Sequence, residues 1–196
     1  FRPSRSAEAY AQIWQEDGSP LLRYCEAMQQ GMQSRLEAAM PGPVHVALGM
    51  SYGSPSIDSA LAELYEKGGY PLRAAEGWAK QGELLKAAQA YETHFTENVS
   101  FGTTYSSTSA SASAEAKSAL LSGQLYEKAG QIEKAIDIYG KGGHHRHCAA
   151  ALLQVGQPGK AAEAYLRAED HENAAAAYEK ALSLDPNEPR AQAGKK

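Results

Sequence analysis

The spacing of apolar positions differs between the first third of the chain and the rest. Residues 6–16 and 20–39 place apolar side chains three and four positions apart, which predicts two helices. Residues 44–50 begin with alternating apolar and polar side chains, which predicts a strand, and a third helix is expected at about 54–66. The segment 1–63 is therefore expected to be a small α/β-like unit of helix, helix, strand and helix.

From residue 64 onward the pattern repeats every 13 residues. A large side chain recurs at Tyr126, Tyr139, Leu152, Tyr165 and Tyr178, and glycine and alanine recur at two further positions of the same step. Within one repeat the apolar residues follow helical spacing and a glycine-containing turn follows them, so each repeat predicts a short helix. Because such a helix is too short to be stable alone in water, pairs of repeats are expected to stack as hairpins.

The regular step is interrupted once. Tyr91 and Tyr126 are 35 positions apart, which is not a multiple of 13, and a Ser/Thr-rich run lies between them. This composition predicts a flexible surface loop. The expected fold class is mostly α: a short-helix α-hairpin repeat array with a small N-terminal α/β-like segment. After the segment 1–63, the predicted parts are first helical repeats at 64–99, the loop at 100–114, further helical repeats at 115–190 and a disordered tail at 191–196.

Composition narrows the classes of function. The chain has 196 residues, of which 43% are hydrophobic and 21% charged. Its net charge is −4, whereas a nucleic-acid-binding protein usually has an excess of basic residues. Cys25 and Cys148 are far apart without CxxC spacing, which is typical of a reducing compartment, so a cytoplasmic protein is expected. No apolar run is long enough to predict a membrane span or a signal peptide.

The histidine-rich run at residues 144–148 carries the residue types of a metal site. His144 and His147, or His145 and Cys148, stand at i and i+3 and would share one helix face, where they could chelate zinc or a softer metal. Two ligands make a weak site, and the alternative interpretation is a polar turn that leads into a repeat helix. The sequence has no Gly-x-Ser-x-Gly elbow and no phosphate-binding loop, so no catalytic residue and no cofactor are expected.

Residues 64–190 resemble the tetratricopeptide-type repeats. The resemblance is carried by the run Leu125–Gly130, with Ala135 and Tyr139 after it, and by the ending Ala177–Asn187. The helices here are shorter than those of the family's unit of about 34 residues and are similar to the short-helix arrays of coat and trafficking proteins. The resemblance implies a scaffold that binds a protein or peptide without catalysis.

Residues 1–65 resemble an early stretch of the bacterial ferrochelatases, which insert iron into protoporphyrin. The resemblance is carried by Arg2–Trp14, by Gly18–Leu21 and by Val46–Ile57. It implies that Arg2, Tyr10 and Ser19 lie near the porphyrin propionates and that Tyr52 lies in the pocket wall. The metal-site His and the distant Glu of a complete member have no counterpart in this chain, and a single strand cannot build a cleft at the ends of parallel strands.

These patterns favour a non-catalytic protein–protein interaction scaffold with an N-terminal cap. The first alternative is an incomplete ferrochelatase-related protein of haem biosynthesis, for which no metal-insertion activity is expected. The second alternative is an artificial or mis-assembled fusion without evolved function. It rests on the absence of an initiator Met and on the change of pattern near residues 61–68.

Overall fold

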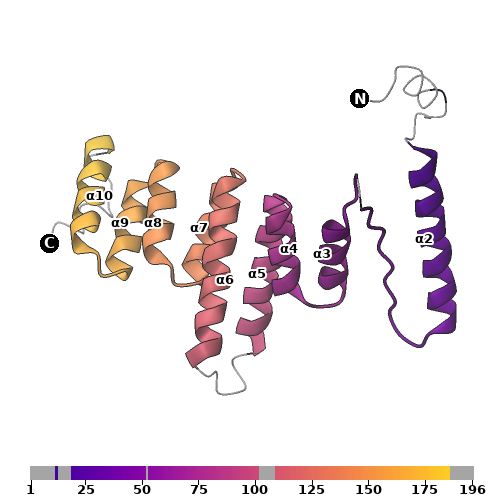
Figure 1. Cartoon of the computed structure of the whole chain (residues 1–196). Helices are drawn as coiled ribbons and strands as arrows, with labels where there is room; N and C mark the ends of the chain where they lie inside the picture. The colour runs from indigo at the N-terminus through magenta and orange to yellow at the C-terminus, as the bar shows by residue number, and fades with distance from the viewer. Residues whose placement is uncertain (1–11, 13–18, 52, 102–108, 186–196) are drawn as a thin grey trace. The chain divides into compact units, whose positions relative to one another are not determined.

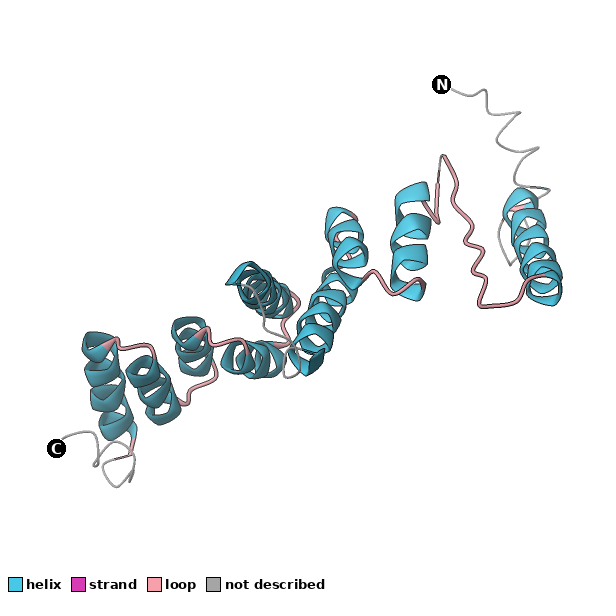
Figure 2. Ribbon diagram, turned by 90° about the horizontal axis from the view of Figure 1, so that it is seen from below, coloured by secondary structure: helices cyan, strands magenta, loops and turns pink. Residues whose placement is uncertain are grey.

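The computed structural model describes Gln12 and residues 19–51, 53–101 and 109–185. These residues form helices joined by turns, and no strand is found among them (Figures 1 and 2). The chain divides into two compact units, Phe1–Tyr70 and Pro71–Lys196, which we call unit 1 and unit 2. The prediction of a mostly α fold is confirmed. None of the described helices has the length and apolar content needed to cross a membrane.

Unit 1 contains α2 (Pro20–Ala39) and α3 (Ile57–Lys67), close to the positions predicted for them. Proline opens α2, where its missing N–H costs no helical hydrogen bond. The side chain of Ser56 caps α3 by accepting a hydrogen bond from the Ser59 amide at 3.1 Å. The helix predicted at 6–16 lies outside the described residues, apart from Gln12, which is helical.

The strand predicted at 44–50 is wrong. Residues 44–49 have no regular secondary structure, and Met50 makes one isolated bridge to Ser56. Two side chains of α2 take the place of a neighbouring strand. Gln33 donates to the Val44 carbonyl at 2.5 Å and accepts from the Val46 amide at 2.7 Å, and Gln29 donates to the Val46 carbonyl at 2.7 Å. A lone extended segment needs such partners because buried backbone groups without hydrogen bonds are costly.

Unit 2 contains a row of helices, each packed mainly against its neighbours in the sequence. Most have 10 to 14 residues, whereas α5 has 18 and α6 has 20. This nearest-neighbour packing is the arrangement of repeat proteins, and Figures 1 and 2 show successive helices running in alternating directions. The helices are α4 (Pro71–Lys80), α5 (Leu84–Phe101), α6 (Ser109–Lys128), α7 (Ile132–Lys141), α8 (His145–Gln154), α9 (Pro158–Arg167) and α10 (His171–Leu184).

The loop predicted at 100–114 is too long. Helix α5 continues through Phe101 and α6 begins at Ser109, so residues 109–114 belong to a helix. The reason is that serine alternates with alanine in this part of the run, and alanine is the strongest helix former. Residues 102–108, between the two helices, lie outside the described residues, as does the tail predicted at 191–196.

The 13-residue step sets the packing of unit 2. The large side chains Tyr126, Tyr139, Leu152 and Tyr178 are buried, and Tyr165 is half-buried between two clusters of the core. The small side chains of the same step let neighbouring helices approach closely. They are Ala74, Ala87, Ser122, Ala135, Cys148, Ala161 and Ala174, all of them buried.

The turns of unit 2 repeat on the same step. Glycine adopts a positive φ of 72–77° after each of five helices, a left-handed conformation in which glycine is favoured because it has no Cβ. The residue at the next step is Glu169, and it adopts the same conformation with a φ of 55°. The turn geometry is therefore kept where the sequence no longer provides glycine. The five glycines are Gly69, which follows α3 of unit 1, and Gly82, Gly130, Gly143 and Gly156.

Candidate functional site

A groove of about 430 Å³ lies between α7 and α9, with side chains of α8 at its base. Cys148 and Leu152 of α8 are 8% and 7% exposed and belong to the core beneath the groove. Because α7 and α9 pack on either side of α8, the groove follows directly from the stacking of successive hairpins. The full lining is Glu133, Ile136, Cys148, Leu152, Gln157, Lys160, Glu163, Ala164 and Arg167.

The groove has an apolar base and a charged rim. Lys160, Glu163 and Arg167 stand at i, i+3 and i+7 of α9, so the helical repeat places them along one edge. Glu133 of α7 supplies a further carboxylate to the lining. The lining thus combines four apolar side chains with four charged ones and Gln157. Such a mixture can bind a partner, because burial of the apolar groups supplies affinity and the charges fix orientation.

Cys148 packs at the base of the groove as a small apolar side chain. Burial raises the pKa of its thiol, and the nearby Arg167 guanidinium lowers it by a smaller amount. Its Sγ lies 3.6 Å from the Ile136 carbonyl oxygen, to which the thiol donates. A thiol with a raised pKa stays protonated at neutral pH, and the protonated form is neither a strong nucleophile nor a metal ligand.

The structure brings His144 and His147 together but does not add Cys148 to them. The two imidazole rings are 6.1 Å apart, centre to centre, at right angles. Each has another neighbour: His144 Nε2 donates to the Ala116 carbonyl at 2.6 Å, and the His147 ring lies 5.4 Å from the Tyr139 ring. Among the described residues no three His, Cys, Asp or Glu side chains are close enough to hold a metal ion. Metal binding by the two histidines stays a prediction.

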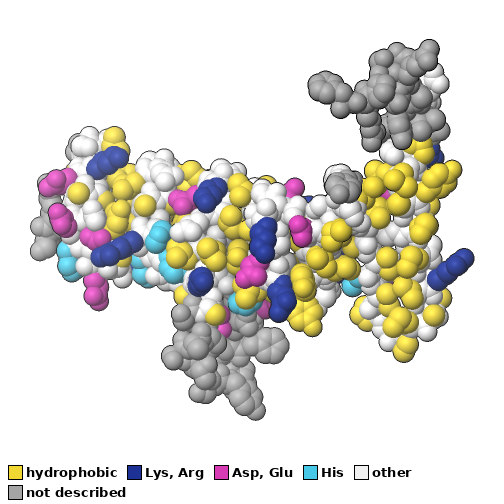
Figure 3. All heavy atoms as spheres, in the orientation of Figure 1, with side chains coloured by type: hydrophobic (Ala, Val, Ile, Leu, Met, Phe, Trp, Pro, Cys, Tyr) yellow, Lys and Arg dark blue, Asp and Glu magenta, His cyan; other side chains and the backbone are white. Residues whose placement is uncertain are grey.

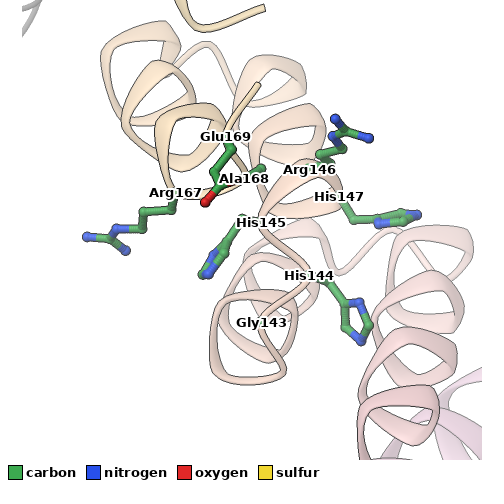
Figure 4. A pocket seen from close by; sticks show the side chains of 8 residues that line it. All are labelled: Gly143, His144, His145, Arg146, His147, Arg167, Ala168 and Glu169. Carbon is green, nitrogen blue, oxygen red and sulfur yellow. The ribbon is translucent and has the colours of Figure 1, made fainter. Parts of the chain in front are cut away.

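A second depression, of about 480 Å³, lies where the turns of two successive hairpins meet. Figure 4 shows His144 and His147 on one side of the start of α8 and His145 on the other. Next to this depression Arg146 Nε lies 3.1 Å from Asp170 Oδ2, so an ion pair joins the two turns. The lining residues are Gly143, His144, His145, Arg146, His147, Arg167, Ala168 and Glu169.

Of the residues that the ferrochelatase resemblance implies for porphyrin binding, the structure describes only Ser19. It is half-buried at the N-cap of α2, where its side chain makes no capping hydrogen bond and its carbonyl accepts from the Arg23 amide at 3.2 Å. Arg2, Tyr10 and Tyr52 lie outside the described residues. Porphyrin binding by these four residues stays a prediction.

Sequence reasoning missed the groove because it is built from three helices. The one local signal was the row Lys160, Glu163 and Arg167 at helical spacing, a pattern that a solvated helix face produces equally well. The ion pair between Arg146 and Asp170 had no signal of its own, since 24 positions separate the two residues.

The stacked hairpins and the groove between them define unit 2 as an α-helical repeat array, a class in which such surfaces bind other proteins. Comparison with known families agrees with this class. Residues 159–188, which begin in α9 and cover α10, match the family model of the tetratricopeptide repeat. Residues 1–72 match the family model of ferrochelatase.

Several curated ferrochelatases match about a third of this chain, in keeping with the family match at residues 1–72. The ferrochelatase of Thioalkalivibrio sulfidiphilus is 51% identical over 67 residues, which is 34% of this chain and 18% of the relative. The coproporphyrin III ferrochelatase of Symbiobacterium thermophilum is 52% identical over 63 residues, or 32% of this chain and 19% of the relative. An Escherichia coli ferrochelatase is 51% identical over 64 residues, or 33% and 18%. The chain thus spans about a fifth of the length of these relatives.

Proposed function

We propose that this chain is a non-catalytic protein-interaction scaffold and that the groove between α7 and α9 binds a peptide segment of a partner protein. The observation that carries the proposal is the groove itself, with its apolar base and its charged rim on a stack of repeat hairpins. The tetratricopeptide match at 159–188 supports it, because that match includes most of α9, one wall of the groove.

The lining indicates the kind of peptide that fits. Ile136, Leu152 and Ala164 supply an apolar surface on which one or two apolar side chains of a peptide would be buried. Lys160 and Arg167 flank Glu163 along α9, so a peptide with carboxylates on either side of its apolar residue would meet opposite charges. A nucleic acid is not the proposed partner, since the groove carries carboxylates as well as cations and the chain has a net charge of −4.

Two further features support a passive, cytoplasmic scaffold. Cys148 lines the groove in a form that burial keeps protonated, which suits packing rather than nucleophilic chemistry. Both cysteines, Cys25 and Cys148, are free thiols, as expected in a reducing compartment.

The test is a selection of peptides from a random displayed library on the full chain. We expect enriched peptides that bind with micromolar dissociation constants. Arg167→Glu, which reverses a charge on the rim, should weaken binding at least tenfold. Lys180→Glu makes the same charge change on α10, away from the groove lining, and should leave binding unchanged. The proposal fails if no peptide is enriched or if both variants bind equally well.

A second candidate is a ferrochelatase-related role for the N-terminal segment, which the identity of 51% over 67 residues favours. We propose that this role does not include metal insertion, because the segment corresponds to 18% of that relative and the matching residues form one part of a porphyrin site at most. The test is incubation of the chain with protoporphyrin and ferrous or zinc ion, followed in the visible spectrum. Protein-dependent metalation above the uncatalysed rate would contradict this proposal.

A further inference from the structure

Helix α2 of unit 1 has three distinct faces along its length. Its inner face is half-buried and includes Gln29 and Gln33, which bind the backbone of Val44 and Val46. A polar face lies next to this inner face, and Gln33 donates to the Glu37 carboxylate at 2.6 Å where the two faces meet. The polar face consists of Arg23, Glu26, Gln30, Ser34 and Glu37. The third face lies on the other side of the inner face, roughly opposite the polar face. It is formed by Leu21, Tyr24, Met28 and Met32, and we call it the apolar stripe.

The apolar stripe lies in water. Leu21 is 62% exposed, Tyr24 73%, Met28 65% and Met32 51%. Figure 3 shows apolar side chains gathered over α2 on the face that it displays. Four such side chains together expose on the order of 600 Å², at the upper end of the apolar patches found on monomeric proteins. A patch of this size on one face of a helix marks an interaction surface.

We propose that the apolar stripe binds the same stripe of a second copy of the chain, with the two α2 helices antiparallel. The stripe can pair with itself about a two-fold axis because large apolar side chains lie at both of its ends and in its middle. With the axis near the middle of the helix, Leu21 of one copy meets Met32 of the other, and Tyr24 of one copy meets Met28 of the other. A surface that is complementary to itself is what a two-fold symmetric dimer requires.

The area and the charges agree with a weak dimer. Two stripes bury together roughly 1,200 Å², at the lower end of the range for specific protein interfaces, so a dissociation constant in the micromolar range is expected. A membrane surface fits less well. Helices that lie on membranes carry an excess of Lys and Arg on their polar face, whereas here Arg23 is accompanied by Glu26 and Glu37.

The experiment is sedimentation velocity of the full chain over a hundredfold range of concentration. We expect a monomer–dimer equilibrium in the wild-type chain. Met28→Glu places a charge in the centre of the stripe and should raise the dimer dissociation constant at least tenfold. Gln30→Glu introduces the same charge on the polar face of the same helix and should leave the constant unchanged, and Met28→Leu should also dimerise.

Helical circular dichroism identifies a variant that has lost its fold. If Met28→Glu loses helix, Tyr24→Gln replaces it, because this change removes the largest side chain of the stripe without adding a charge. The proposal is overturned if the wild-type chain stays monomeric throughout, or if the stripe variants dimerise like the wild type. It is also overturned if the chain is monomeric in solution and floats with phosphatidylcholine vesicles, which would assign the stripe to a membrane.

Discussion

The hydroxyl of Tyr139 donates a hydrogen bond to the carboxylate of Glu127 across an Oη–Oε2 distance of 2.8 Å, while the aromatic ring is fully buried. The same relationship recurs one repeat earlier, where Tyr126 donates to Glu92 at 2.6 Å. Glu127 directly follows Tyr126 in the sequence, as Glu92 follows Tyr91. The tyrosines therefore join successive helices in two ways, by ring packing in the core and by a charge-assisted hydrogen bond at its edge.

Tyr139→Phe keeps the ring and removes the hydrogen bond to Glu127. We expect the free energy of unfolding to fall by about 1–2 kcal/mol, since hydrogen bonds to charged groups are stronger than neutral ones. Urea unfolding followed by circular dichroism measures the change. Tyr24→Phe removes a hydroxyl from a side chain that is 73% exposed and should change stability by less than about 0.5 kcal/mol. Equal effects of the two changes would contradict a role for the Tyr139 hydroxyl.

Alkaline pH should destabilise unit 2 through the same tyrosines. Burial, reinforced by the hydrogen bond to Glu127, raises the pKa of Tyr139 well above its ordinary value near 10, and burial and Glu92 do the same for Tyr126. An unfolded tyrosine ionises first, so stability is complete below pH 10 and falls as the pH rises above it. Unfolding midpoints measured from pH 8 to 11 test this, and Tyr139→Phe should make the fall shallower. A slope identical to that of the wild-type chain would count against the assignment.

Gly123 of α6 lies directly against the Tyr139 ring. A Cβ at this position would come within 2.3 Å of a ring carbon, so Gly123→Ala forces the ring or the helices apart. We expect a loss of about 1–3 kcal/mol in the free energy of unfolding, as for other overpacked cores. Gly140→Ala is the matched control, because its Cβ would meet no atom within 4 Å and alanine favours a helix. Stability should be unchanged or higher in the control. A larger loss of stability in Gly140→Ala than in Gly123→Ala would contradict the close packing of Gly123 against the Tyr139 ring.

Glu169 occupies a turn position where the earlier repeats have glycine. Its φ of 55° is left-handed and strained for a residue with a Cβ. Glu169→Gly should therefore raise the free energy of unfolding by about 0.5–1 kcal/mol, and Gly156→Ala, at a φ of 72°, should lower it by about 1 kcal/mol. Thermal unfolding of the two variants measures whether each change raises or lowers the free energy of unfolding. A destabilising Glu169→Gly would mean that the carboxylate contributes more than the strain costs.

The sequence alone was sufficient to predict the short helices of unit 2. Tyr126, Tyr139 and Tyr178 recur on a 13-residue step and are buried, and the glycines of the same step end the helices in a left-handed turn. These features are local, because helical spacing and the conformational freedom of glycine act within a few residues. A pattern that repeats also requires neighbours of the same kind to bury it, which is why the stacking could be predicted as well.

Tertiary structure decided the features in which residues distant in the sequence meet. Val44 and Val46 lie in a segment with the local pattern of a strand, but a strand needs a neighbouring strand, and Gln29 and Gln33 satisfy the backbone there instead. The groove combines side chains of α7, α8 and α9, whose positions depend on how the helices stack. The same holds for the apolar stripe of α2. Its sequence spacing shows that the residues share a face, and only the structure shows that no described residue buries them.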